Sequence, residues 1–279
     1  MNEPVASGFH SDTRESPEHI SQALRQLVSV KARFLRCQRE IKFLGAPESG
    51  SKLGLIDELT APFQASEQVR TYLLVALDNL RVLLRYFSKT NELPMIAFYS
   101  LIRPAIESTS YGMWLLWGNG NDKKASRSLR ISRQNFNSFK SLGTEFSLSS
   151  SSTSTDVQIK TLHSNLRGVE SRALENAIQA TSIISAVDGY LSPRTSFFTG
   201  LQVWRSTSGI AHANAPVMAV LLERHPDGPN PGDSATRTSR LTFVVGFIET
   251  ALENMEALLD LYAKSCAAPH RKSATKIPS

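Results

Sequence analysis

Apolar residues along most of the chain recur every three or four positions, which is the spacing of one face of an α-helix. The clearest repeat lies near the carboxyl end, holds over three heptads and predicts a long amphipathic helix packed along a bundle or a partner. Its positions are Leu241, Val245, Ile248, Leu252, Met255, Leu259 and Tyr262. No segment alternates apolar with polar residues and carries β-branched side chains. The pattern therefore predicts an all-α fold.

The breaks between the apolar stripes divide the chain into further helices. They are predicted over residues 17–45, 66–91, 94–117, 122–140, 156–180, 199–213 and 216–222, with a turn of helix near 55–63. The helix over 94–117 is long enough to cross a bilayer, but Arg103, Pro104 and Glu107 near its middle predict a buried helix instead. Small residues in one row of it, Ser108 and Gly112 among them, predict the close approach of another helix.

We expect one domain, a single multi-helix bundle over residues 16–266 that ends in the long helix. The serine and threonine cluster at about 146–156 has no apolar periodicity and predicts a flexible loop inside that bundle. Residues 1–15 and the basic tail over 267–279 are expected to be disordered.

The charge balance indicates an anionic partner only in one internal segment. The chain has 279 residues with 31 Lys and Arg against 25 Asp and Glu, a net charge of +6. Half of this excess lies in the tail, but Arg127, Arg130 and Arg133 recur every three residues in a predicted helix. This stripe is either a solvated helix face or a phosphate-binding surface.

Several kinds of chemistry find no support in the sequence. The six histidines contain no i, i+4 pair, and no dinucleotide, P-loop or nucleophile-elbow motif occurs, so no metal and no cofactor are expected. Two cysteines, Cys37 and Cys266, are too few for a disulfide framework and fit a reducing compartment. The first residues do not resemble a secretory signal, and we expect a cytoplasmic protein without a membrane span.

One pair of residues suggests acid–base chemistry on a phosphodiester. Arg205 and His212 are seven residues apart, so on a helix they share a face, about 10 Å apart along its axis. A guanidinium can neutralise a phosphorane, and an imidazole can move a proton near neutral pH. The alternative is a core or capping histidine near the end of a helix. Arg103 and Glu107, an i, i+4 pair, are either supporting residues of the same site or a structural ion pair.

The segments that carry these residues also support a resemblance. The runs LIRPAIESTSYGMWLLW, RSLRISR and VWRSTSGIAHAN resemble a group of bacterial helical proteins of unassigned function, with an R-x3-E helix and an R-x6-H helix. The spacing from Arg205 to His212 is similar to the R-x4-6-H signature of the HEPN superfamily. The resemblance implies an all-α protein that often forms a homodimer. In many members it implies a metal-independent ribonuclease of toxin or phage-defence systems.

Two hypotheses follow. In the first, the chain is an HEPN-like endoribonuclease with Arg205 and His212 as catalytic residues and RNA as its substrate. Arg127, Arg130 and Arg133 then contact the RNA backbone, and an antitoxin or regulatory protein is a partner. In the second, the chain is a non-catalytic helical protein that dimerises through its carboxyl-terminal helix and binds a protein partner.

Overall fold

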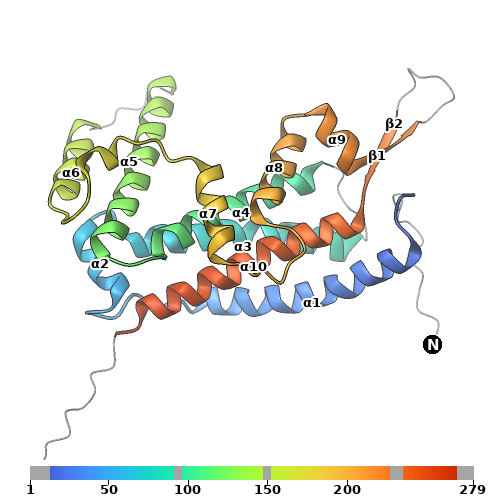
Figure 1. Cartoon of the computed structure of the whole chain (residues 1–279), viewed down its shortest axis with the longest axis horizontal. Helices are drawn as coiled ribbons and strands as arrows, with labels where there is room; N and C mark the ends of the chain where they lie inside the picture. The colour runs from blue at the N-terminus through green and yellow to red at the C-terminus, as the bar shows by residue number, and fades with distance from the viewer. Residues whose placement is uncertain (1–12, 91–95, 147–151, 227–234, 269–279) are drawn as a thin grey trace, which may run out of the picture. The chain divides into compact units, whose positions relative to one another are not determined.

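The computed structural model describes residues 13–90, 96–146, 152–226 and 235–268, which form ten α-helices, one turn of 3-10 helix and a two-stranded sheet (Figure 1). The prediction of an all-α fold with a long carboxyl-terminal helix is confirmed. In chain order the elements are α1 (Pro17–Lys42), α2 (Lys52–Thr60), α3 (Ala65–Thr90), α4 (Ala97–Leu116), α5 (Asn121–Glu145), α6 (Ser152–Ser164), η1 (Ser171–Leu174), α7 (Ala180–Tyr190), α8 (Gly200–Ala211), α9 (Ala215–Leu221), β1 (Leu222–Pro226), β2 (Ala235–Ser239) and α10 (Leu241–Cys266).

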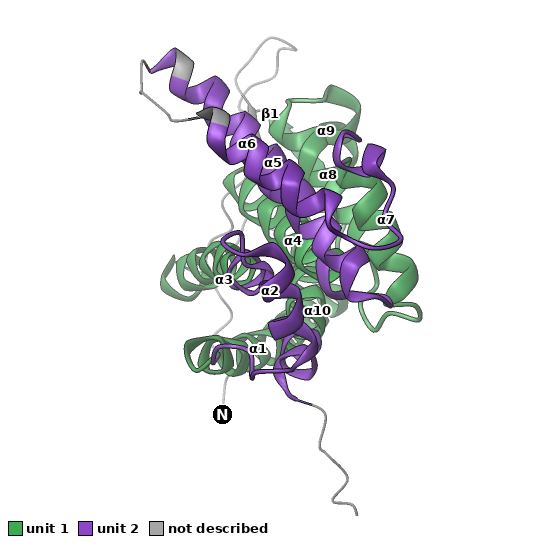
Figure 2. Ribbon diagram, turned by 90° about the vertical axis from the view of Figure 1, so that its left-hand side faces the viewer, with its two compact units in different colours: residues 1–44, 71–114, 179–259 green, residues 45–70, 115–178, 260–279 purple. Residues whose placement is uncertain are grey.

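The chain divides into two compact units, coloured separately in Figure 2. The first unit takes residues 1–44, 71–114 and 179–259, and the second takes 45–70, 115–178 and 260–279. Each unit is thus assembled from segments that are far apart in the sequence.

The core of the first unit is built around α10. Its heptad positions from Leu241 to Leu259 are at most 4% exposed, so the face that the repeat predicts is covered within this chain. Polar contacts fix α1 alongside it: the Arg33 guanidinium pairs with Glu256 at 2.6 Å and with Glu249 at 3.4 Å. Dimerisation through the carboxyl-terminal helix, as in the second hypothesis, would therefore have to use another face of α10.

Local sequence signals explain where the helices of this unit begin. Ser16 caps α1 and accepts a hydrogen bond from the His19 amide, with Pro17 in the first turn. Thr199 and Gln202 form a reciprocal capping box at the start of α8. The chain after α9 forms β1 and β2, an antiparallel pair with Leu222 opposite Ser239.

The second unit is organised around α5, which packs against α2, α6 and η1 (Figure 2). Leu129 and Ile131 supply buried apolar contacts from α5. The Gln68 amide donates to the hydroxyls of Ser128 at 2.9 Å and Ser132 at 2.8 Å. Helix α5 thus has one buried face and one face that carries the predicted basic stripe.

Several sequence predictions need correction. The predicted helix over 156–180 is wrong, because α6 ends at Ser164 and the chain turns at Gly168, whose φ of +63° suits glycine. The loop expected at about 146–156 is wrong over its last residues, since α6 starts at Ser152, while residues 147–151 lie outside the described part. The β1–β2 pair was not expected, and residues 227–234 between its strands lie outside the described part.

Residues 13–15 contact the hairpin and α10: Thr13 donates to Glu223, and Glu15 accepts hydrogen bonds from the Leu241 and Thr242 amides at 2.6 and 2.8 Å. The disorder expected for residues 1–15 and 267–279 stays a prediction. Residues 1–12 and 269–279 lie outside the described part.

No helix of the described chain has the length and apolar composition needed to cross a membrane. Helix α4, the segment in question, has Ile102, Ala105 and Ile106 fully buried within the protein. The interpretation of this segment as a buried helix is confirmed.

The small-residue row of α4 also behaves as the sequence indicates. A Cβ atom at Gly112 would lie 2.6 Å from Leu258 Cδ2, so α10 approaches α4 at the glycine. The buried Leu258 side chain leaves no room for a larger residue.

We predict that Gly112→Val lowers the free energy of unfolding by about 1–3 kcal/mol, because the added atoms overpack this contact. The matched control is Gly189→Ala in α7, where nothing lies within 4 Å of the added Cβ. The control should be neutral or gain up to about 1 kcal/mol from helix propensity. Urea denaturation of both variants measures the difference, and equal stability of the two would contradict the close approach.

Candidate functional site

The predicted pair Arg103 and Glu107 lies on α4 and meets α8 at Trp204. The Trp204 indole N–H donates to Glu107 Oε2 at 3.0 Å, and the Arg103 guanidinium lies over the indole ring, 5.2 Å from its centroid. Arg103 Nε is 3.9 Å from the same carboxylate oxygen. The ion pair between Arg103 and Glu107 is therefore long, and both side chains also contact Trp204.

Two tyrosines extend this cluster along the same unit. The rings of Tyr72 and Tyr111 are 6.0 Å apart. Burial raises the pKa of both phenols, and the Glu107 carboxylate adds to the increase. Glu107 thus accepts a hydrogen bond from an indole and acts electrostatically on two phenols. Its environment is half-buried and largely aromatic.

Arg205 and His212 lie on the solvent side of α8. Arg205 follows Trp204, and His212 is the residue at which the helix ends, its amide donating to the Ser208 carbonyl at 3.0 Å. Both residues are exposed, and no hydrogen bond or ion pair ties either side chain to another residue of the described chain. Their spacing of two helical turns leaves them on one face, open to solvent.

The predicted residues of this unit do not form one buried cluster. The side chains of Arg103 and Glu107 are 30% and 35% exposed and are held by Trp204, whereas Arg205 and His212 point to solvent. Gly209 marks a close approach of two helices. A Cβ there would meet Val217 at 2.7 Å, so the glycine lets α9 fold back against α8 just beyond the pair.

The basic stripe of α5 is half-buried in the second unit. Arg127 Nη1 donates to the Trp117 carbonyl at 2.7 Å, and Arg130 Nη2 donates to the Asn176 carbonyl at 3.2 Å. Arg133 pairs with Glu175 at 2.7 Å and Asp156 at 2.9 Å. These two carboxylates raise the pKa of Arg133 and offset its charge, whereas burial lowers the pKa of Arg127 and Arg130.

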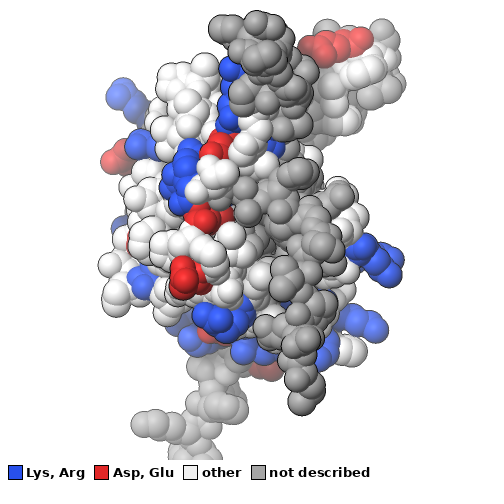
Figure 3. Space-filling model, turned by 90° about the vertical axis from the view of Figure 1, so that its right-hand side faces the viewer, with Lys and Arg blue, Asp and Glu red and all other residues white. Residues whose placement is uncertain are grey.

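The stripe borders a hollow of about 510 Å³ between α5 and the segment that follows η1. Its lining combines guanidinium, amide, hydroxyl and short apolar groups. Lining residues include Arg130, Arg133, Gln134, Asn137, Asn176 and Ile178. On the face seen in Figure 3, acidic and basic side chains are interspersed.

A polar network around Arg194 escaped the sequence analysis. Its guanidinium, 7% exposed, pairs with Asp188 at 2.9 Å and Glu253 at 3.1 Å and donates to Asn254 Oδ1 at 2.6 Å. Asp188 also accepts from the Gly200 and Leu201 amides at 2.7 and 2.8 Å, which holds the first turn of α8. No periodic signal marks Arg194, since its partners on α10 are about sixty residues away.

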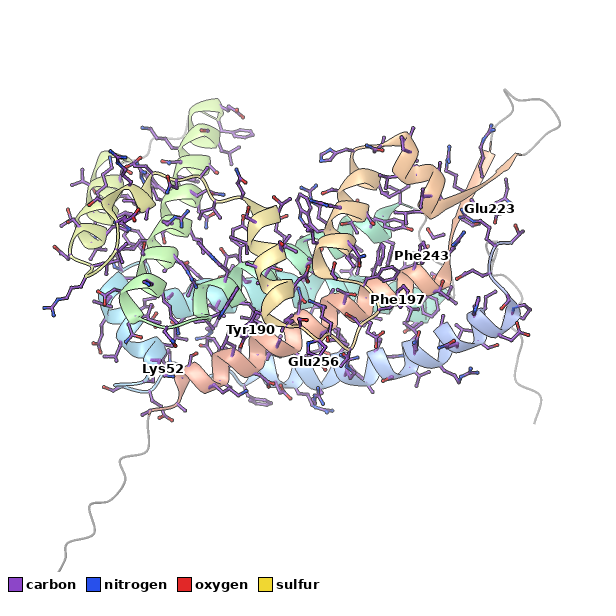
Figure 4. All side chains as sticks on the ribbon, in the orientation of Figure 1. Lys52, Tyr190, Phe197, Glu223, Phe243 and Glu256 are labelled. Carbon is purple, nitrogen blue, oxygen red and sulfur yellow. The ribbon has the colours of Figure 1, made fainter. Side chains whose placement is uncertain are left out.

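This network also positions an aromatic loop. Phe198 packs edge-on against Phe247 and Phe243 of α10, with ring centroids 4.9 and 5.5 Å away, while the neighbouring Phe197 is 87% exposed (Figure 4).

The pKa of Glu253 is lowered within this network. Burial alone would raise it, but hydrogen bonds from Ser196 and Thr195 and the charge of Arg194 bring the pKa below its ordinary range.

A second overlooked contact joins α5 to α6. His163, 4% exposed, lies with Nε2 2.9 Å from the Ser126 hydroxyl. Burial lowers the pKa of its imidazole, and the charge of Arg130 lowers it further. The histidine is therefore kept neutral in the folded unit.

The described residues contain no group of three or more His, Cys, Asp or Glu side chains that could hold a metal ion. The chain matches no family model, no curated protein and no solved structure. Its function must therefore be argued from the site itself.

We predict that Arg194→Ala lowers the free energy of unfolding by about 3 kcal/mol or more, because it leaves two carboxylates that are only 14% and 15% exposed without their shared cation. Arg194→Lys keeps the charge but not the planar donor geometry and should fall between that variant and the wild type. Arg25→Ala, an exposed site on α1, should change stability by less than about 0.5 kcal/mol. Thermal and urea unfolding measure all three; a loss for Arg194→Ala as small as that for Arg25→Ala would refute the network's role.

The low pKa of His163 predicts a stability that depends on pH. The unfolded chain binds a proton at this residue near pH 6.5, while the folded chain does so only at lower pH, so stability falls as the pH drops below about 6.5. His163→Gln should reduce this loss in a melting series from about pH 7 to about pH 5.5. His19→Gln, at an exposed site on α1, should melt like the wild type throughout the series.

Proposed function

We propose that the protein is an HEPN-like, metal-independent endoribonuclease with Arg205 and His212 as its catalytic residues. One observation carries the proposal: a guanidinium and an imidazole lie two turns apart on one helix face, both exposed and neither tied to the rest of the described chain. The matching R-x6-H spacing supports the same assignment, and His212 is at the carboxyl end of α8, where its imidazole is open to solvent.

The reaction is an internal transesterification. In the proposed step, His212 accepts the proton of a ribose 2′-hydroxyl as its oxygen bonds to the adjacent phosphorus. The bond from phosphorus to the 5′-oxygen breaks, and that oxygen leaves with a proton from water or from a second imidazole. Arg205 neutralises the charge that builds up on the phosphorane oxygens. The products are a 2′,3′-cyclic phosphate and a free 5′-hydroxyl.

Arg103 and Glu107 have a supporting role in this proposal. Their contacts with Trp204 fix the part of α8 that immediately precedes Arg205. They are positioning residues, because they act on the guanidinium through the helix.

Arg127, Arg130 and Arg133 are the proposed contacts to the RNA backbone. Arg130 and Arg133 line the polar hollow of the second unit, where amide side chains such as Asn137 can bind base edges. Because two carboxylates already offset the charge of Arg133, Arg127 and Arg130 are expected to contribute most.

The biological setting is part of the same proposal. A toxin or phage-defence role in the cytoplasm implies an antitoxin or regulatory protein as a partner. A homodimer would bring two copies of the Arg205–His212 pair together, and it would use a surface other than the buried face of α10.

The proposal predicts that the purified chain cleaves RNA in the presence of a chelator and leaves cyclic phosphate ends. Arg205→Ala and His212→Ala should each lower the cleavage rate by about 100-fold or more, the range of a lost acid–base or charge-stabilising group. Both sites are exposed, so melting temperatures should be unchanged. End-labelled RNA with gel analysis measures the rate, and His19→Gln is the matched control.

The outcomes separate the two functions. An intact RNA substrate with the wild-type chain, or wild-type cleavage by His212→Ala, rejects the ribonuclease. The second candidate, a non-catalytic protein that binds a partner, is favoured by the exposed Phe197 on a loop anchored by Arg194. It predicts no cleavage, and it predicts loss of partner binding in Phe197→Ser.

A further inference from the structure

Lys124 is an unusual residue of the second unit. It lies in the first turn of α5 and is only 7% exposed, although lysine is rarely buried without a partner. No hydrogen bond or ion pair joins its ammonium group to another residue of the described chain. A cation in this setting has given up much of its hydration without gaining a counter-ion.

The two charges that act most on it in the fold are also positive. Helix α2 packs on α5, and its first residue is the exposed Lys52 (Figure 4). Arg127 follows Lys124 one turn later on α5. Burial lowers the pKa of Lys124, and the charges of Lys52 and Arg127 lower it further, so both cations lie within electrostatic reach of Lys124.

The loop before α5 holds Arg127 in place. The Trp117 carbonyl accepts from its Nη1 at 2.7 Å, and a Cβ on Gly118 would lie 4.0 Å from both terminal nitrogens. Gly118 and Gly120 have φ values of +90° and +88°, which lets the chain turn tightly around the guanidinium. The acid of this turn, Asp122, accepts a hydrogen bond from the Arg167 amide at 2.9 Å.

We propose that Lys124, Lys52 and Arg127 form a binding site for a phosphate group. A tetrahedral dianion offsets several cations at once and accepts hydrogen bonds from ammonium and guanidinium donors, which a single carboxylate does less well. The proposal explains why a buried lysine is kept beside two like charges. It goes beyond the ribonuclease function and requires neither Arg205 nor His212.

The test compares the melting temperature of the full chain in phosphate and in chloride at equal ionic strength. The wild type should gain stability with increasing phosphate, because a ligand that binds only the folded state shifts the equilibrium. Lys124→Met keeps the aliphatic stem and removes the charge. It should match or exceed the wild type in chloride and lose the phosphate effect, with an affinity by calorimetry at least about tenfold weaker.

Lys123→Met, at an exposed neighbouring site, is the matched control and should keep the effect. If Lys124→Met does not fold, Lys52→Met removes an exposed cation of the same site and should weaken phosphate binding. The proposal is overturned if phosphate and chloride stabilise the wild type equally, or if Lys124→Met keeps the full phosphate effect. A loss of stability in Lys124→Met that is the same in both salts would assign the lysine a purely structural role.

The source of the phosphate group is decided by competition. If the site takes the backbone of RNA, a short single-stranded oligoribonucleotide displaces inorganic phosphate and Lys124→Met weakens its binding. If the ligand is free phosphate or a small phosphorylated molecule, the oligoribonucleotide leaves the affinity for phosphate unchanged. Both results support the site, and neither depends on RNA cleavage.

Discussion

The guanidinium of Arg194 is the contact on which the organisation of the first unit depends. It gathers Asp188, Glu253 and Asn254 at hydrogen-bonding distance in a place that is almost closed to solvent. Through Asp188 the network reaches the first amides of α8, and through Glu253 and Asn254 it reaches α10. Charged groups in such a site are stable only as a complete set. The direction of α8, and with it the placement of Arg205 and His212, follows from that set.

In the second unit, the basic side chains of α5 differ in how their charges are balanced. Arg133 is matched by Asp156 and Glu175, but Lys124 adjoins cations. One helix thus carries both a satisfied ion-pair network and a group whose charge is not balanced within the described chain. Folding stability alone does not account for the second arrangement, because removing an unpaired buried charge normally stabilises a protein. The imbalance points to a ligand.

Periodicity was a reliable guide where a helix buries a continuous face. The α10 repeat and the small-residue row of α4 were predicted because each residue's environment follows from its place on one helix. Predictions failed where the chain leaves one element for another. No apolar repeat predicts the turn at Gly168 or the β1–β2 pair, and a helix-like composition continues past the end of α6.

By itself, the sequence determined the helical class, the long carboxyl-terminal helix and the shared face of Arg205 and His212, since all three depend on the period of the α-helix. Only the tertiary structure decided which of these residues are buried, paired or open to solvent. It exposed the Arg205–His212 pair, tied Arg103 and Glu107 to Trp204, and placed Lys124 among cations. Such contacts join residues that are distant in the chain, and burial and charge pairing arise only when those residues meet.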